Sequence, residues 1–199
     1  MAALTLSKSA LQDQRRKLAS YRRFLPSLDM KRQQLAAERA KAVAELQEAE
    51  TALAGFLSDI GERLPMLANR EIDLGGLVEL VSLEQDQQNV VGVWLPRLVS
   101  FEVKAKDYSW LGRPAWVDVA AARLRDCVEL NLRVRFARRR VEILEKGLRQ
   151  ITQRVNLFDK ILIPRTRKNI QLIQVYLGDA ERTAVVRSKV AKRKRAAAA

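Results

Sequence analysis

Histidine is absent from this 199-residue chain, which removes the commonest general base and the commonest metal ligand of proteins. The Ser/His and Cys/His nucleophile pairs are excluded with it. The single cysteine, Cys127, cannot form an internal disulfide and suits a reducing compartment. No glycine-rich phosphate-binding loop follows a predicted strand. We therefore expect a protein that is not an enzyme by itself, with no catalytic residues, no cofactor and no bound metal.

Long apolar runs are also missing. No stretch reaches the roughly 18 apolar residues that a membrane-spanning helix needs. The N-terminus has no signal-peptide pattern either, because Lys8, Arg15 and Arg16 come where an apolar core would be required. The expectation is a cytoplasmic protein without direct membrane insertion.

The sequence instead carries a seven-residue apolar repeat over residues 120–176 and a second one over residues 11–67. Apolar spacings of three and four that persist this long are typical of a coiled coil. Because one such helix is not stable alone in water, the two segments are predicted to pair as an antiparallel hairpin of helices. The predicted contact positions include Leu18, Leu25, Leu35, Leu46, Leu53, Val141, Leu144, Leu148, Ile151, Val155, Phe158 and Leu162, and the repeat continues through Arg165, Asn169, Leu172 and Tyr176.

The middle of the chain has a different architecture, since nine of the thirteen glycines and prolines fall within residues 55–117. Residues 99–105 alternate strictly between apolar and polar, the period of a half-buried strand. Residues 77–83 and 90–95 also have an extended pattern, and the polar run 84–89 between them predicts a turn. The fold class is thus expected to be mainly α, a long antiparallel two-helix coiled coil with a small β-hairpin-containing insert at the bend. The expected division is an N-terminal coiled-coil helix (1–70), the middle region (71–117), a C-terminal coiled-coil helix (118–190) and a flexible tail (191–199).

Two prolines interrupt the helical repeats. Pro26 and Pro164 each lack the N–H that a helix interior uses, so a bend is predicted at both positions. The charged runs of the helices, such as Glu45, Glu50 and the Arg138–Arg140 triplet, are expected to lie on solvated faces.

Positive charge is concentrated in the second half of the chain. Of the net charge of +14, residues 118–199 supply +13, from 21 Lys and Arg against 8 Asp and Glu. In a folded hairpin, residues 1–32 (net +6) lie beside residues 160–199 (net +9). Such a basic end favours an acidic surface or a polyanion as its partner.

Four short stretches carry a resemblance to a known family. They are Arg154-Val155-Asn156-Leu157-Phe158 with Ile163-Pro164-Arg165 after it, the Leu28–Leu35 segment, Asn89-Val90-Val91-Gly92-Val93, and the charged segment after Asp179. In this order, on a helix–hairpin–helix plan, they resemble the D subunit of the V/A-type rotary ATPases, the axle of the central stalk. The matching interface positions are Lys31, Arg32, Asn89, Gly92, Arg154, Asn156, Pro164, Arg165, Arg187 and Lys189.

The resemblance implies a central rotor shaft that transmits torque between the ATP-hydrolysing or ATP-synthesising hexamer and the ion-translocating membrane ring. The implied partners are the catalytic A and regulatory B subunits of the hexamer, the F subunit of the central stalk and the socket subunit on the membrane ring. It implies no nucleic-acid partner, and a cytoplasmic location peripheral to the membrane.

Two alternative interpretations remain. The stalk coiled coil associated with type III secretion ATPases is also a helical hairpin, but it has no use for the β-patterned middle region. A basic nucleic-acid-binding coiled coil would place base-stacking aromatics among its basic residues. Here the aromatics are mostly in the middle, away from the basic end.

Overall fold

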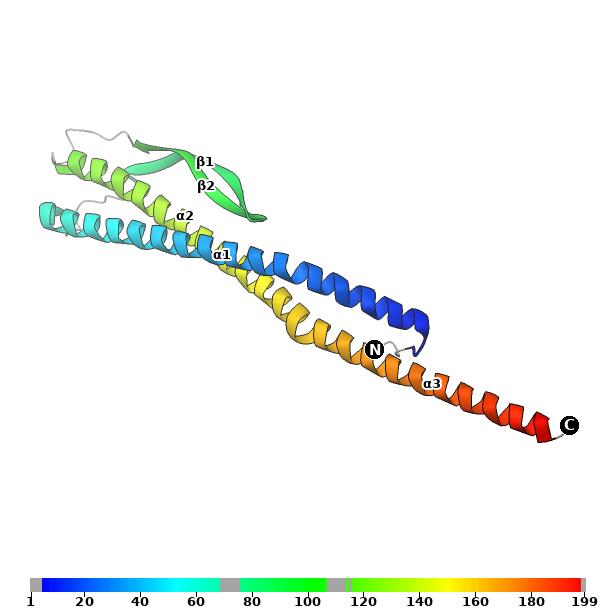
Figure 1. Ribbon diagram of the computed structural model, residues 1–199. Helices are drawn as coiled ribbons and strands as arrows, with labels where there is room; N and C mark the ends of the chain where they lie inside the picture. The colour runs from blue at the N-terminus through cyan, green and yellow to red at the C-terminus, as the bar shows by residue number, and fades with distance from the viewer. Residues whose placement is uncertain (1–4, 69–75, 107–113, 115, 198–199) are drawn as a thin grey trace. The chain divides into compact units, whose positions relative to one another are not determined.

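The computed structural model describes residues 5–68, 76–106, 114 and 116–197. The elements follow in the order α1 (Lys8–Arg63), the 3₁₀ turn η1 (Pro65–Ala68), β1 (Val78–Val90), β2 (Val93–Ala105), α2 (Trp116–Asn156), the π-helical turn η3 (Leu157–Leu162) and α3 (Ile163–Ala197) (Figure 1). A long N-terminal helix and a long C-terminal helical segment thus flank one antiparallel β-hairpin in the sequence. The mainly α fold class is confirmed.

The chain divides into two compact units. We call Met1–Arg32 with Gln150–Ala199 the terminal unit, and Gln33–Arg149 the middle unit. Each unit takes one part of α1 and one part of the C-terminal helical segment, and the expected division into segments 1–70, 71–117, 118–190 and 191–199 stays a prediction. Part of the expected middle region, residues 71–75, 107–113 and 115, lies outside the described residues.

Helix α1 begins after Ser7, whose Oγ accepts a hydrogen bond from the backbone N–H of Ala10 at 3.2 Å. This is the usual role of a serine N-cap, which satisfies one of the free N–H groups of the first turn. The helix then continues through Pro26 to Arg63. Pro26 therefore does not end the helix, and the Ser27 hydroxyl beside it donates to the carbonyl oxygen of Phe24 at 2.9 Å.

The hairpin corrects one prediction, because the turn expected at residues 84–89 is wrong. Strand β1 runs through that polar segment to Val90, and the reversal occurs at Val91 and Gly92, with φ of +53° and +78°. Positive φ at both central residues is the tight hairpin turn that matches strand twist. The Asn89 side-chain oxygen accepts the Gly92 N–H at 2.8 Å and fixes this turn. The polar residues 84–89 are compatible with a strand because every residue of β1 between its two end residues is exposed to solvent.

The extended segment predicted at residues 90–95 does not end before Pro96. Pro96 lies inside β2, opposite Gln87. A sheet of only two strands leaves one edge of each strand unpaired, where a residue without an N–H costs no ladder hydrogen bond. The register shifts twice, between Leu80 and Ser82 and between Glu84 and Gln85.

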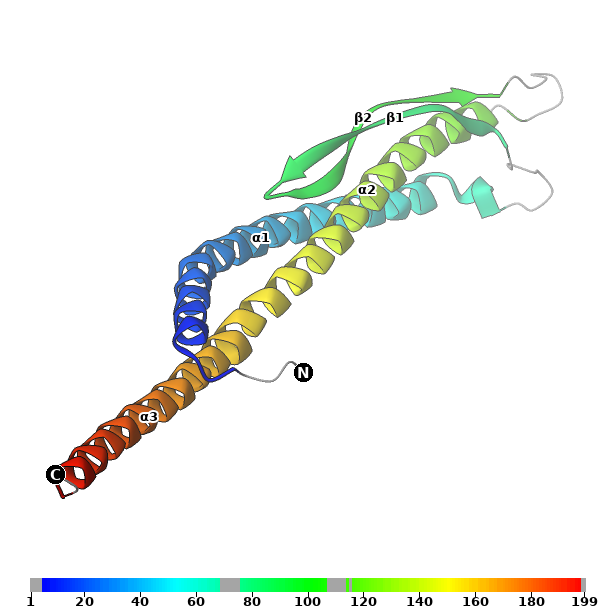
Figure 2. The same ribbon diagram turned by 90° about the vertical axis from the view of Figure 1, so that its right-hand side faces the viewer.

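Within the middle unit, the hairpin lies along α2 in both views (Figures 1 and 2). Its inward residues Leu95 and Val103 are buried. At the turn, a Cβ placed on Gly147 would lie 3.1 Å from Cγ2 of Val93, so the glycine permits a close approach of hairpin and helix. The buried side chains of the middle unit are Leu35, Ala42, Leu77, Leu95, Val103, Val117, Ala120, Ala121, Leu132, Val134 and Leu144.

After residue 162, the predicted contact positions of the repeat are displaced by one residue from the side chains that are buried. The repeat placed Arg165, Leu172 and Tyr176 in the contact row, but all three are exposed. The π-helical turn η3 explains the shift, since its wider hydrogen-bonding pattern accommodates one extra residue and displaces every later heptad position by one. Beyond it the buried side chains are Ile163, Thr166 and Ile173. Helix α3 continues to Ala197, past the helix end predicted near residue 190.

Candidate functional surfaces

Three ion pairs join α1 to α2 in the middle unit. Arg39 donates to Oε1 of Glu145 through both Nη2 (2.6 Å) and Nε (3.1 Å). Two further pairs, both at 2.8 Å, are Arg140–Glu45 and Arg138–Glu50. Residues with higher sequence numbers on α1 pair with residues with lower sequence numbers on α2. The two helices are therefore antiparallel here. Of the charged residues that we expected on solvated faces, Glu45, Glu50 and Arg138 are exposed and Arg140 is half-buried, and these four pair across the helices.

The Arg39–Glu145 pair has a measurable electrostatic signature. The hydrogen bond from Arg39, with its charge, lowers the pKa of Glu145 below its usual value. Both side chains remain partly exposed, so solvent screening keeps the stabilisation modest. Ion pairs that are screened by solvent in this way add little to the free energy of unfolding. Their main effect is to favour one register of the two helices.

The hairpin presents an exposed outer surface. Trp94 and Val99 of β2 are both 59% exposed, and Val81 of β1 is 52% exposed. Exposed apolar side chains mark a protein-binding surface where they gather in one patch, so these three residues are candidates for such a surface. Polar groups lie between them, since the Ser100 hydroxyl donates to Glu84 Oε2 at 2.7 Å.

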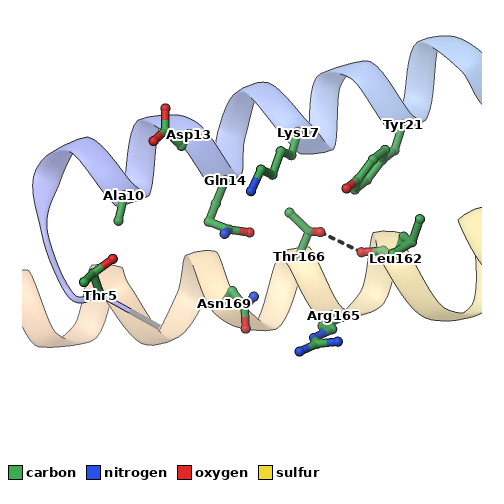
Figure 3. Close-up of a pocket in the computed structure, with 10 residues that line it drawn as sticks. All are labelled: Thr5, Ala10, Asp13, Gln14, Lys17, Tyr21, Leu162, Arg165, Thr166 and Asn169. Atoms are coloured by element: carbon green, nitrogen blue, oxygen red, sulfur yellow. Dashed lines mark hydrogen bonds between the residues drawn. The ribbon is translucent and has the colours of Figure 1, made fainter. Parts of the chain in front are cut away.

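The terminal unit contains a cavity of about 430 Å³, lined by both polar and apolar side chains, between α1 and the segment that follows Ile161 (Figure 3). Gln14 and Lys17 of α1 face Thr166 and Asn169 of α3 across it. The Thr166 hydroxyl donates to the carbonyl oxygen of Leu162 at 2.7 Å, so this buried polar group is satisfied within its own helix. The complete lining is Thr5, Ala10, Asp13, Gln14, Lys17, Tyr21, Leu162, Arg165, Thr166 and Asn169.

Two contacts set the direction of the helices in the terminal unit. The rings of Tyr21 and Phe158 meet edge to face, with centroids 5.4 Å apart and planes at 86°. Lys8 pairs with Glu181 at 3.5 Å, a highly exposed ion pair. The contact residue with the lower sequence number in α1, Lys8, meets the partner with the higher sequence number, Glu181. The helices of this unit are therefore also antiparallel.

The predicted contact positions up to Leu162 have reduced exposure, in contrast to Arg165, Leu172 and Tyr176. Leu35 and Leu144 are each 1% exposed, and Ile151 and Val155 are also buried. The remaining positions are half-buried: Leu18, Leu25, Leu46, Leu53, Val141, Leu148, Phe158 and Leu162.

The interface positions implied by the family resemblance lie in separate places rather than in one site. Lys31 and Arg32 are half-buried on α1, where Arg32 pairs with Asp29 at 2.6 Å. Asn89 and Gly92 form the hairpin turn. The other positions are exposed on α2 and α3: Arg154, Asn156, Pro164, Arg165, Arg187 and Lys189. No small-molecule site follows from such a distribution.

Sequence reasoning missed the ion pairs between the helices. The available signal was Arg39, a charged residue at a predicted contact position of the heptad repeat. A charge in such a row needs a partner on the facing helix. Finding Glu145 as that partner required the register of the two helices, which the repeat alone does not supply.

Neither a metal centre nor a membrane span is found in the described part of the chain. Across residues 5–68, 76–106, 114 and 116–197, no group of three or more Cys, Asp or Glu side chains could hold a metal ion. Over the same ranges, no helix combines the length and the apolar character needed to span a bilayer.

Comparison with known proteins gives a consistent result. A family model described as the ATP synthase D subunit matches residues 10–193. The D subunit of the V-type ATP synthase of Borreliella burgdorferi is 29% identical over 199 aligned residues, covering 96% of this chain and 95% of that protein. The proteins of the same name from Chlamydia felis and Chlamydia pneumoniae are 32% and 31% identical, and cover 96% and 95% of this chain. The alignments span 93% and 91% of those two relatives.

Proposed function

This chain belongs to the family of ATP synthase D subunits, and from that membership we propose that it is the central rotor shaft of a V/A-type ATPase or ATP synthase. As a shaft it transmits torque between the hexamer that hydrolyses or makes ATP and the membrane ring that moves ions. Its relatives are named as subunits of a V-type ATP synthase, so the chain acts as one subunit of such a complex.

The observation that carries this proposal is the antiparallel helix pairing in each unit. In the middle unit Arg39 pairs with Glu145 and Glu50 with Arg138, and in the terminal unit Tyr21 meets Phe158. Two paired helices resist bending and twisting more than one helix does. This is the mechanical property that torque transmission needs.

The chemistry of ATP then belongs to other subunits, and this chain is non-catalytic. The basic terminal unit enters the hexamer, where its exposed Lys and Arg side chains meet acidic surfaces of the A and B subunits. Exposed ion pairs exchange partners at a cost of about 0–1 kcal/mol each. Such contacts hold a rotating shaft loosely enough to turn.

The middle unit faces the other partners. Its exposed hairpin surface, with Trp94 and Val99, is suited to bind the F subunit of the central stalk and the socket subunit on the membrane ring. In this proposal the chain lies in the cytoplasm, peripheral to the membrane, as part of the complex.

A reconstituted complex tests this function. With the full chain, ATP hydrolysis should drive ion movement into sealed vesicles. Truncation after Arg182 should lower ion movement per ATP hydrolysed while leaving the chain folded, because the buried positions up to Ile173 survive the cut. Unchanged coupling in the complex that lacks this chain altogether would overturn the proposal.

A further inference from the structure

Helix α3 carries two overlapping rows of side chains, displaced from each other by one residue. One row continues the heptads of the preceding helix without interruption, and it contains Leu172 and Tyr176. The second row contains Ile163, Thr166 and Ile173, which are the buried side chains of this helix. Of the first row, Leu172 is 56% exposed and Tyr176 is 50% exposed, and Val175 beside them is 65% exposed. At this end of α3 the first row is therefore turned away from α1, whereas Leu162 and Asn169 of the same row line the cavity next to α1. Adjacent residues of a helix point about 100° apart. When one row packs against α1, the other row therefore cannot pack against it.

The π-helical turn η3 determines which of the two rows packs against α1. Its hydrogen bond runs from the N–H of Ile163 to the carbonyl oxygen of Phe158, five residues back instead of four. A single π turn of this kind adds one residue to a helix without breaking it. Val155 before the turn and Ile163 after it are both buried although they are eight residues apart, one more than a heptad. The extra residue therefore accounts for the change of row.

Pro164 stands directly after this turn and supplies a reason for it. In a regular α-helix its N–H would bond to the carbonyl of Lys160, but proline has no N–H and its ring clashes with that carbonyl. The wider π turn moves the backbone away from this clash. Pro164 itself is exposed and Asp159 and Lys160 are exposed, so no side-chain packing at these three positions competes with the effect on the backbone.

The space around α3 also permits either row to face α1. The cavity between the helices has a volume of about 430 Å³ and is lined by polar side chains such as Gln14, Lys17 and Asn169. A tightly packed apolar core would oppose a rotation of α3, because interiors at native density have no room for it. Beside Leu162 and Asn169 the interface is not packed in that way, although Ile173 further along α3 is fully buried.

We propose that Pro164 and the π turn Leu157–Leu162 form a phase-setting element, which packs the Ile163–Thr166–Ile173 row against α1 and turns Leu172, Val175 and Tyr176 outward. Without the proline the turn relaxes to an α-helix, α3 rotates by one residue position, and Leu172 and Tyr176 replace Ile173 in the interface. The element therefore determines which apolar row the terminal unit presents to its surroundings. The phase-setting element is a property of the chain alone and does not depend on the rotor assignment.

Thiol labelling of the full chain tests the element. In a Cys127→Ser background, Leu172→Cys and Ile173→Cys are compared for their rates of reaction with a maleimide. With Pro164 in place, the cysteine at 173 should react more slowly than that at 172 by about tenfold or more, because a buried thiol reacts only through local opening. Pro164→Ala should invert this ratio. The substitution favours the helix, since alanine has a higher helix propensity than proline, so the variant should remain folded.

A compensating deletion provides the matched control. Removal of Lys160 from the Pro164→Ala chain takes out the extra residue, so a regular α-helix then places Ile173 in the interface again and the original ratio should return. An unchanged ratio in Pro164→Ala would show that the proline does not set the phase. Equal labelling at 172 and 173 in the parent chain would refute the packed row itself.

Discussion

At the scale of single residues, Glu145 is a side chain whose ionisation is coupled to the pairing of α1 with α2. Its pKa is lowered in the folded chain by the hydrogen bond and charge of Arg39. The carboxylate therefore stabilises the folded state at pH values above its unfolded pKa, and this contribution disappears as the pH falls through the lowered folded pKa. Glu145→Gln should lower stability at pH 7, and the difference from the parent should shrink toward pH 3.

Urea unfolding at the two pH values measures this effect. Glu142→Gln is the control, since Glu142 pairs with Arg139 within α2 at 3.0 Å and links no second helix. The loss of unfolding free energy relative to the parent should change less between the two pH values in Glu142→Gln than in Glu145→Gln. Equal pH dependence in the two variants would show that Arg39 gives Glu145 no special role.

Gly147 marks a close approach of the hairpin to α2. Alanine in place of a helix-interior glycine normally stabilises by about 0.5–1 kcal/mol. At Gly147 the new methyl group would meet Val93 at 3.1 Å, whereas at Gly55 it would meet nothing within 4 Å. Gly55→Ala should therefore raise the free energy of unfolding more than Gly147→Ala does.

Thermal melts of Gly147→Ala with and without the additional substitution Val93→Ala test whether the Val93 side chain limits the stabilisation. If the side chain of Val93 causes the difference, Gly147→Ala should gain most of the missing stabilisation in the Val93→Ala background. An identical gain in both backgrounds would mean that hairpin and helix are not in contact at this point.

At the scale of elements, the heptad repeat makes a quantitative prediction. Leu144 is 1% exposed, so Leu144→Asp would bury a charge without a partner. Loss of a buried leucine side chain alone costs about 2–5 kcal/mol, and the unpaired carboxylate adds to that cost. Circular dichroism melts should show a large loss of helix stability.

Gln150→Asp supplies the comparison, because Gln150 is exposed in the same helix and gains the same charge. Its effect should stay within about 0.5 kcal/mol, as for most surface substitutions. Similar losses in the two variants would show that Leu144 is not a contact position.

Most of the fold was predictable because the spacing of apolar residues is a local signal. The two long helices and a hairpin between them follow from periods of seven and two, and the structure bears out that fold class. The turn was misplaced because Glu84–Asn89 reads as a loop by composition, while exposed β1 tolerates polar residues along its length. The phase shift after Leu162 was missed because a π turn leaves no mark in an apolar repeat. The ion pairs depend on helix register, which is a property of two segments at once.

The hairpin can be tested as a binding element. Replacing residues 82–94 with a short glycine linker removes the exposed Trp94 and the turn but spares Leu95 and Val103, which are buried. The paired helices should stay folded, and binding of the F subunit should weaken, because exposed aromatic residues contribute much of the energy at protein interfaces. A pull-down with purified F subunit measures this. Full retention of F by the shortened chain would remove the role assigned to the hairpin.

At the scale of the whole molecule, the composition agrees with a shaft rather than with an active site. The chain has no histidine and a net charge of +14, and its exposed arginines and lysines are distributed along long helices. A polar cavity with Gln14, Lys17 and Asn169 interrupts the interface of the terminal unit, while the middle unit holds most of the buried apolar side chains. We therefore expect the terminal unit to unfold more readily than the middle unit, since local stability follows buried apolar contact.

The central claim is that this chain turns inside its complex. Trp94 is 59% exposed at the hairpin, so Trp94→Cys in a Cys127→Ser background gives an attachment point for a bead, with the ATP-hydrolysing hexamer fixed to a surface. On addition of ATP the bead should rotate continuously in one direction. A bead that stays fixed relative to the hexamer while ATP is hydrolysed would contradict the account.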